Sequence, residues 1–178
     1  MQIRPAEPAD AEAVARLHVD AWRTAYRGLV PDSFLESLDW NRRAQRFRES
    51  LAQKDEETYL VELEGVVLGF VTLGACRDED VDPEVVGEIW GIYLAPQHWR
   101  KGIGRQLCRF GERILHSRGF QEITLWVFTG NEQARRFYEA MGYRADGATK
   151  ILNPGAPLET VRYRRALGDA EPAFPEDN

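Results

Sequence analysis

The sequence contains little cysteine and histidine and no long apolar run. Its 178 residues include two cysteines, Cys76 and Cys108, which are too few for a disulfide framework. Its three histidines form no cluster with cysteine or acidic residues at metal-ligand spacing, so we predict no metal site. No stretch is apolar enough to span a membrane and no leader-like segment opens the chain, so we expect a cytoplasmic location and no membrane partner.

The chain also lacks an excess of positive charge. It has 23 Lys and Arg against 29 Asp and Glu, and the net charge of −6 argues against nucleic acid as a partner, because binding to a phosphate backbone needs a broad basic face. There is no internal repeat, and the length suits one domain with a sizeable core. Acidic residues concentrate over 77–84, where they could steer a cationic amine or belong to an ordinary solvated loop.

The stretch Glu88–Leu107 is the most informative part of the sequence. It reads EIWGIYLAPQHWRKGIGRQL and predicts an apolar strand, a basic glycine-containing turn and an amphipathic helix. The turn would present backbone N–H groups at a helix N-terminus, where unpaired donors and the helix dipole favour a phosphate. We therefore predict that a pyrophosphate binds here. The residues expected to contact it are Arg100, Lys101, Gly102, Ile103, Gly104 and Arg105.

Spacing excludes two common phosphate-binding motifs. A dinucleotide-binding fold requires a third glycine at position 107, which is Leu, and a nucleoside triphosphate loop requires a Gly-Lys-Ser or Gly-Lys-Thr sequence, which is absent. The stretch instead resembles motif A of the GNAT superfamily, the Gcn5-related N-acetyltransferases, which reads Q/R-x-x-G-x-G/A after a strand that ends near a proline. Here Pro96 follows the strand, Gly102 and Gly104 match the glycines, and Trp99 replaces the usual Gln or Arg.

The rest of the chain predicts an order of elements that matches the GNAT fold. Apolar periodicity indicates helices from about Pro8, from Asp32 as N-cap, after the basic turn, and over 131–141. Strands are expected near residues 2–4, 59–63, 66–73, 85–94, 123–128, 143–145 and 160–167. We expect an α/β (α+β) domain over residues 1–167, with about six to seven strands in a mixed twisted sheet and about four helices, and a disordered acidic tail over 168–178.

The resemblance implies a particular gap in this sheet. In GNAT folds the fourth and fifth strands splay, and the pantetheine arm of coenzyme A pairs with backbone groups in the gap as though it were a strand. In this chain the corresponding edge is Ile92, Tyr93 and Leu94. Gly91 indicates either a bulge that redirects this strand or space for a neighbouring side chain.

A tyrosine in the last predicted helix matches a second motif of the family. Residues 131–143, NEQARRFYEAMGY, resemble motif B, in which a tyrosine meets the sulfur of the cofactor. Tyr138 occupies that position, and a phenol can protonate a departing thiolate. Tyr138 also fits the apolar stripe of its helix, so burial in the core is the alternative. Asn131 is expected to cap the helix and, as the resemblance implies, to contact the cofactor.

Glu88 is the candidate general base. An amine with a pKa near about 10 is mostly protonated at neutral pH and must lose a proton before it attacks. Glu88 lies fourteen positions before Gly102, the offset at which family members with a glutamate base place it. Partial burial could raise its pKa, and the alternative is a glutamate at a strand edge that faces solvent.

The resemblance implies an N-acetyltransferase, an acyltransferase that moves the acetyl group of acetyl-CoA to a primary amine in a ternary complex. The backbone N–H of Leu94 is the simplest donor to the tetrahedral oxyanion. Trp22 and Tyr26 could line the acceptor pocket or anchor the corner between the first two helices, and His18 is expected to be packed and hydrogen-bonded. A non-catalytic module that binds or senses acyl-CoA is the rival function. The acceptor stays open, and family members are often homodimers.

Overall fold

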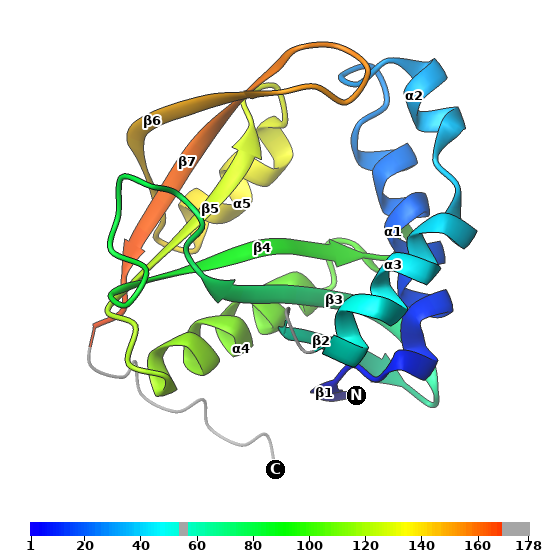
Figure 1. Ribbon diagram of the computed structural model, residues 1–178, viewed down its shortest axis with the longest axis horizontal. Helices are drawn as coiled ribbons and strands as arrows, with labels where there is room; N and C mark the ends of the chain where they lie inside the picture. The colour runs from blue at the N-terminus through cyan, green and yellow to red at the C-terminus, as the bar shows by residue number, and fades with distance from the viewer. Residues whose placement is uncertain (54–56, 169–178) are drawn as a thin grey trace.

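Seven strands form one mixed sheet in the computed structural model, which describes residues 1–53 and 57–168 (Figure 1). The strands are β1 Gln2–Pro5, β2 Glu57–Leu63, β3 Val66–Ala75, β4 Val86–Leu94, β5 Glu122–Phe128, β6 Arg144–Leu152 and β7 Leu158–Ala166. Their order across the sheet is β1-β2-β3-β4-β5-β7-β6. All neighbours run antiparallel except β4 and β5, which run parallel.

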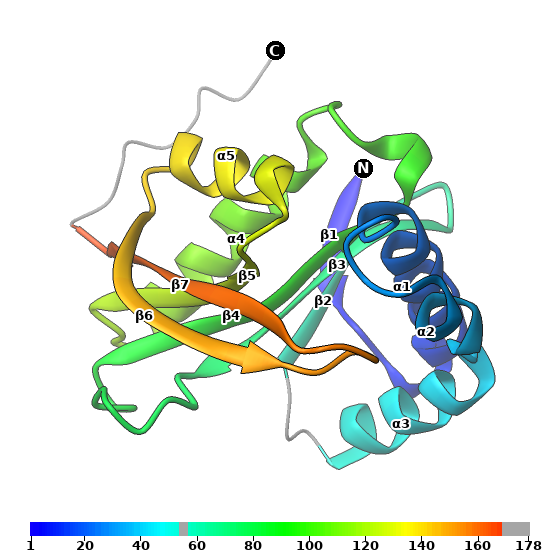
Figure 2. The same cartoon turned by 90° about the horizontal axis from the view of Figure 1, so that it is seen from above.

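Helices cover both faces of this sheet. In the described residues they are α1 Ala11–Ala25, α2 Asp32–Ser37, α3 Trp40–Gln53, α4 Ile103–Ser117 and α5 Glu132–Ala140. Short 3-10 turns, Pro8–Asp10 and Pro96–His98, precede α1 and α4. α4 and α5 lie on one face, and α1, α2 and α3 lie on the other (Figure 2).

The alternation of strand side chains builds a core on each face. Leu60 and Phe70 point toward α1, where they pack with Leu17. Their chain neighbours Val61 and Val71 point the opposite way and join the core beside α4. Because successive side chains of a strand point to opposite faces, the apolar runs of β2 and β3 serve both cores.

The predicted order of elements is confirmed, but the predicted second helix is two helices. α2 ends where Leu38 takes an extended backbone conformation, and α3 begins at Trp40. The side chain of Arg23, from α1, donates to carbonyl groups at the end of α2, including that of Leu38 at 3.0 Å. This contact satisfies carbonyls that a helix end leaves unpaired, so the chain can turn there. Asp32 is the first residue of α2 and not its N-cap.

The predicted strand over 143–145 is also longer than expected. β6 extends from Arg144 to Leu152, with a shift in its register against β7 between Ala145 and Thr149. Gly147, with a φ of +94°, lies inside this irregular part. A glycine within a strand pattern usually indicates a turn or a bulge, so the sequence pattern did not predict that the strand continues beyond it. Most of the predicted tail, residues 169–178, lies outside the described residues.

The predicted splay between β4 and β5 is confirmed. The two strands pair over three positions, Val86 with Glu122, Gly87 with Ile123 and Glu88 with Thr124. Beyond Glu88 the rest of β4 pairs with β3 alone. The register against β3 shifts at Trp90, so β4 has a bulge beside Gly91. A Cβ at Gly91 would lie 2.6 Å from the ring of Tyr93, so this glycine both follows a bulge and leaves space for a neighbour.

Candidate active site

A cavity of about 530 Å³ occupies the splay between β4 and β5. Its walls come from α1, the unpaired part of β4, the turn before α4, β5 and α5. The lining includes these residues predicted to bind the cofactor: Ile92, Tyr93, Leu94, Trp99, Arg100, Gly102, Gly104, Arg105, Asn131 and Tyr138. Lys101 and Ile103 do not line it, since the side chain of Ile103 is buried in the core and Lys101 is exposed at the turn.

The basic turn adopts a backbone that favours a glycine at its end. Gly102 has a φ of +82° and is the N-cap of α4, while Arg100 has a φ of +60°. At Gly104 a glycine is favoured by close packing instead of by backbone conformation, because a Cβ there would lie 3.2 Å from Cδ1 of Leu94. The first turn of α4 therefore lies close against the end of β4, and its N–H groups open toward the cavity end that Arg100 and Arg105 line.

Trp99 has a structural partner at the position where it departs from the motif. Its indole Nε1–H donates to the carbonyl of Leu94 at 2.9 Å. The side chain thus ties the basic turn to the end of β4, and its ring forms part of the cavity wall. The N–H that Gln or Arg would offer to a ligand is used inside the protein.

The backbone of β4 presents alternate residues to the splay. The N–H of Ala95 donates to Leu68, which places it on the β3 side. Because N–H and C=O groups alternate in direction along a strand, those of Ile92 and Leu94 point to the opposite side, toward the cavity. Tyr93 therefore contributes its ring to the lining while its backbone pairs with β3.

Tyr138 lies on α5 with its side chain buried at the cavity wall. Burial, with the Cys108 thiol and the phenols of Tyr26 and Tyr93 nearby, raises the pKa of Tyr138 well above its usual value. The phenol is therefore protonated at neutral pH and can act as a proton donor. Asn131 caps α5, as predicted, since its Oδ1 accepts from the N–H of Ala134 at 3.1 Å, and it also lines the cavity.

Glu88 is buried beside the cavity and bound to an arginine. It is 2% exposed, which excludes the alternative of a glutamate that faces solvent. Its carboxylate accepts from Arg77 three times, from the backbone N–H at 3.1 Å, from Nε at 3.1 Å and from Nη2 at 2.6 Å. Glu88 is not part of the cavity lining, and its role as a base stays a prediction.

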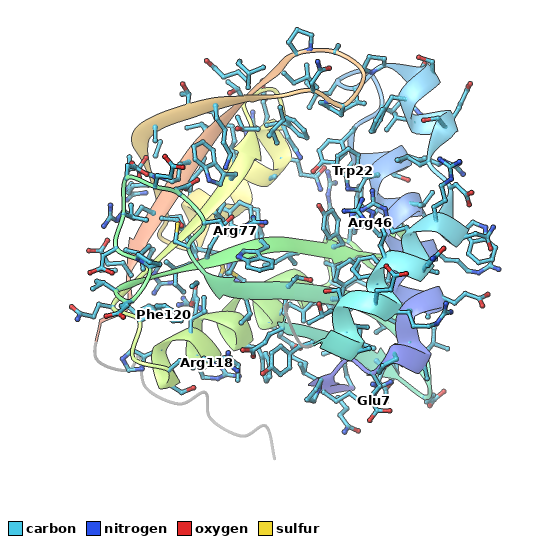
Figure 3. The ribbon with its side chains drawn as sticks, viewed as in Figure 1. Glu7, Trp22, Arg46, Arg77, Arg118 and Phe120 are labelled. Carbon is cyan, nitrogen blue, oxygen red and sulfur yellow. The ribbon has the colours of Figure 1, made fainter. Side chains whose placement is uncertain are left out.

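The two aromatic residues at the end of α1, Trp22 and Tyr26, lie differently with respect to the cavity. Tyr26 lines the cavity, and burial raises its pKa. Trp22 does not line it and packs behind Tyr26, with ring centroids 4.6 Å apart. Phe128 of β5 meets Tyr26 with ring centroids 5.2 Å apart, so these rings join the end of α1 to the end of β5. Figure 3 shows the side chain of Trp22 on α1.

His18 is packed among rings, as expected, and only half hydrogen-bonded. Its Nε2 accepts from the guanidinium of Arg43 at 3.2 Å, because arginine only donates. Its Nδ1 has no hydrogen-bond partner among the described residues. Burial, together with repulsion from Arg43, lowers the pKa of His18 to about 2.

Several cavity residues were missed from the sequence. Trp90 and Trp126 line it from β4 and β5, and Gln133 and Arg136 line it from the first turns of α5. The spacing of Gln133 and Arg136 from Asn131 places them near the same helix end, a signal that could have been used. No sequence signal indicated which face the two tryptophans take.

The described residues hold no group of three His, Cys, Asp or Glu side chains that could bind a metal ion, and none of the helices is long and apolar enough to cross a membrane.

Two acidic residues of the loop after β3, Asp78 and Asp80, bind side chains of the sheet. Asp78 accepts from Nε1 of Trp126 at 2.9 Å and forms ion pairs with Lys150 and Arg162, and Asp80 pairs with Arg162 as well. Burial opposes ionisation of Asp78, but its hydrogen bonds from Trp126 and Arg162 outweigh burial and hold its pKa below the usual value. These two acidic side chains therefore have internal partners.

Comparisons with known proteins agree with this geometry. Residues 13–143 match the acetyltransferase (GNAT) family. The chain is 31% identical over 143 residues to the N-acetyltransferase YuaI of Bacillus subtilis, covering 78% of this chain and 77% of that protein.

Two solved structures share the fold. One is the PaiA N-acetyltransferase of Thermoplasma acidophilum in complex with coenzyme A, with a TM-score of 0.71, 19% identity, and coverage of 93% of this chain and 98% of the other. The second is yncA of Salmonella typhimurium with acetyl-CoA, with a TM-score of 0.70, 22% identity, and coverage of 99% and 98%. At these identities the likeness concerns the fold alone.

Proposed function

Because this chain belongs to the acetyltransferase (GNAT) family, we propose that it moves the acetyl group of acetyl-CoA directly to a primary amine of an acceptor in a ternary complex. One observation carries the proposal: the cavity in the β4–β5 splay has a phosphate-type turn at one end and aromatic side chains at the other. Acetyl-CoA bound along β4 would have its phosphates at the turn and its acetyl group near the aromatic end.

The cofactor end suits coenzyme A in charge and shape. The turn offers backbone N–H groups at the start of α4, and Arg100, Arg105 and Arg136 add positive charge to the lining. The cavity-facing backbone groups of Ile92 and Leu94 would pair with the amides of the pantetheine arm. We assign the N–H of Leu94 to the developing oxyanion, since its carbonyl is already bound by Trp99.

Tyr138 is the proposed general acid. The amine nitrogen attacks the thioester carbon, the carbon–sulfur bond then breaks, and the sulfur takes the proton of the Tyr138 hydroxyl. The Tyr138 phenol is protonated at neutral pH and can therefore donate as negative charge develops on the sulfur. The phenol is restored when a proton returns from the acceptor side or from water.

The proton of the attacking amine must leave through water. Within the described part of the chain, the lining holds no Asp, Glu or His. The raised pKa of Tyr26 and Tyr138 means that neither phenol is a ready acceptor. We propose that Glu88, which is bound to Arg77, takes this proton through water molecules.

Release of free thiol from acetyl-CoA in the presence of a pooled panel of primary amines tests the proposal. We expect amine-dependent thiol release together with an acetylated amine detected by mass. Binding of acetyl-CoA without turnover on any amine would identify a non-catalytic acyl-CoA module. Absence of binding would exclude both functions.

A further inference from the structure

A cluster of hydrogen-bond donors lies where α1 and α3 meet β4. We name it the Arg43 cluster, and its members are His18, Trp22, Arg43 and Tyr93. Nη1 of Arg43, from α3, lies 3.2 Å from Nε2 of His18, and the ring centroids of His18 and Tyr93 lie 4.4 Å apart. Tyr93 also lines the cavity in the splay, so the cluster borders the cavity at this residue.

The cluster contains donors that the protein leaves without acceptors. Because Nε2 of the neutral His18 ring accepts from Arg43, the ring hydrogen is on Nδ1, which has no partner among the described residues. The indole N–H of Trp22 is buried and has no partner in the same part of the chain. Buried donors normally have partners, so a group with several acceptor lone pairs would complete this cluster.

Arg43 also brings a positive charge that no carboxylate balances. Its hydrogen-bond partner is the neutral ring of His18, and neither Arg43 nor Arg46 forms an ion pair within the described chain. Burial lowers the pKa of Arg43, and repulsion from Arg46, on the next turn of α3, acts in the same direction against the opposing effect of Tyr93. Figure 3 shows Arg46 beside Trp22, on the side of α1 and α3 that faces the middle of the molecule. Two neighbouring cations in this position favour an anion between them.

The phenol of Tyr93 connects the cluster to the splay. Its hydroxyl lies 3.4 Å from the position of a Cβ built on Gly91, and Gly91 lines the cavity. Burial raises the pKa of Tyr93, while the N–H of Trp22 and the charge of Arg43 act in the opposite direction, so both groups lie near this phenol. A ligand in the cavity that reaches the Tyr93 hydroxyl is therefore close to Arg43.

The position of the cluster on the sheet separates it from the phosphate-type turn. Tyr93 packs into the core on the face that α1, α2 and α3 cover, whereas α4 begins on the opposite face (Figure 2). The cavity passes from one face to the other through the splay, since it is lined by Tyr93 and also by Leu125 and Val127 of the core beside α4. An anion at the Arg43 cluster would therefore belong to the acceptor and not to the phosphates of coenzyme A.

We propose that the acceptor is a primary amine that carries a carboxylate, as a free amino acid does, with the carboxylate bound by Arg43 and the Tyr93 hydroxyl and the amine directed toward the acetyl group. This inference rests on the proposed acetyltransferase function and adds the class of acceptor. The carboxylate supplies the counter-charge that Arg43 lacks, and a planar guanidinium can hold it with two parallel N–H···O bonds. His18 accepts one N–H of Arg43 and leaves its other N–H groups for this ligand.

Pairs of acceptors that differ only in the carboxylate test the class. Each free amino acid, together with β-alanine and γ-aminobutyrate, is compared with its own amide for thiol release from acetyl-CoA. We expect the best acid to exceed its amide in kcat/KM by at least about tenfold, the ratio that 1.4 kcal/mol gives. Amides that match their acids, or turnover confined to amines without a carboxylate, would overturn the acceptor class and leave the acetyltransferase function intact. Thiol release with no amine of any kind, while acetyl-CoA binds, would instead remove the proposed function and the acceptor class with it.

Substitution of Arg43 tests the carboxylate site. We expect Arg43→Gln to lower the acid-to-amide ratio of kcat/KM toward one, because only the acid loses a charged partner. Arg43→Lys keeps the charge and should retain part of this ratio, and Tyr93→Phe, which removes only a hydroxyl, should lower it.

Arg42→Gln is the matched control for these variants. Arg42 is the neighbour of Arg43 on α3 and is exposed outside the cavity lining, so the ratio should stay at the wild-type value. A ratio that is the same in wild type, Arg43→Gln and Tyr93→Phe would refute the carboxylate site.

Discussion

At the scale of single residues, Tyr138 carries the sharpest test of mechanism. We expect Tyr138→Phe to lower kcat by about 10²-fold or more, the usual size of a general-acid contribution, with little change in KM for acetyl-CoA. The ring still fills its place in the wall, so only the proton donor is lost. Steady-state kinetics of thiol release measure both constants.

Tyr143→Phe is the matched control for that variant. Tyr143 is fully buried near Cys108, and its side chain does not line the cavity. Its loss of a hydroxyl should therefore leave kcat unchanged. Turnover that is equal in wild type and Tyr138→Phe would remove Tyr138 from the reaction.

Glu88 has two possible effects that a pH profile separates. If Glu88 takes the amine proton through water, Glu88→Gln should lower kcat about 10²-fold near neutral pH, and the loss should shrink at higher pH as the free amine becomes abundant. If Glu88 only holds Arg77, the variant should lower the melting temperature and keep the wild-type pH dependence of kcat. A parallel measurement of thermal unfolding distinguishes the two.

His18 should make stability depend on pH. Its pKa of about 2 in the folded protein lies below the ordinary value of 6.5, so the unfolded chain binds the proton more strongly. The contribution of His18 to the free energy of unfolding is therefore fully present above pH 6.5 and falls as the pH decreases below that value. The loss from this residue is at most about 1.4 kcal/mol per pH unit. His18→Phe keeps an aromatic ring and should give a shallower slope in denaturant unfolding between pH 6.5 and 4.

His116→Gln provides the comparison, because His116 is exposed on α4. Between pH 6.5 and 4, the slope of the free energy of unfolding against pH should be the same in His116→Gln as in wild type. Equal slopes in wild type and His18→Phe would contradict the assignment of this pH dependence to His18.

At the scale of elements, the start of α4 joins backbone strain to cofactor binding. Gly102→Ala would force a side chain into a left-handed conformation, at a cost of about 1 kcal/mol, with no atom within 4 Å to obstruct it. We expect a lower melting temperature together with a raised KM for acetyl-CoA, because the N–H groups of this turn would shift.

Gly119→Ala is the control for this strain. Gly119 follows α4 at its other end with a φ of +93° and open space around it. The same substitution should lower the melting temperature to a similar extent while KM for acetyl-CoA stays at the wild-type value. A rise in KM in both variants would mean that general destabilisation, and not the turn, affects binding.

Elements also show where sequence reasoning stops. Glycines at helix ends can be predicted from the sequence, because Gly102, Gly119 and Gly142, which have left-handed conformations, lie where the helical patterns begin or end. The break between α2 and α3 could not be predicted in this way. The carbonyls at this break are bound by Arg23 of α1, which is remote from them in the sequence. Local patterns carry no record of such a contact.

At the scale of the whole molecule, the splay makes the site. The two strands pair where β4 begins and then diverge, and the bulge at Trp90 redirects β4 away from β5. The cores on both faces of the sheet keep β4 in place through α1 and α4. The cavity thus follows from the packing of both helical layers and not from one motif.

The sequence by itself determined the family, the order of strands and helices, and the phosphate-type turn, because these depend on local spacing and periodicity. The tertiary structure alone decided that Arg77 binds Glu88 and that Trp90 of β4 and Trp126 of β5 line the same cavity. A strand pattern gives the alternation of side chains but not which face meets which partner, and the bulge in β4 shifts that alternation by one residue. The cavity between β4 and β5 therefore follows only from the placement of the two strands in space.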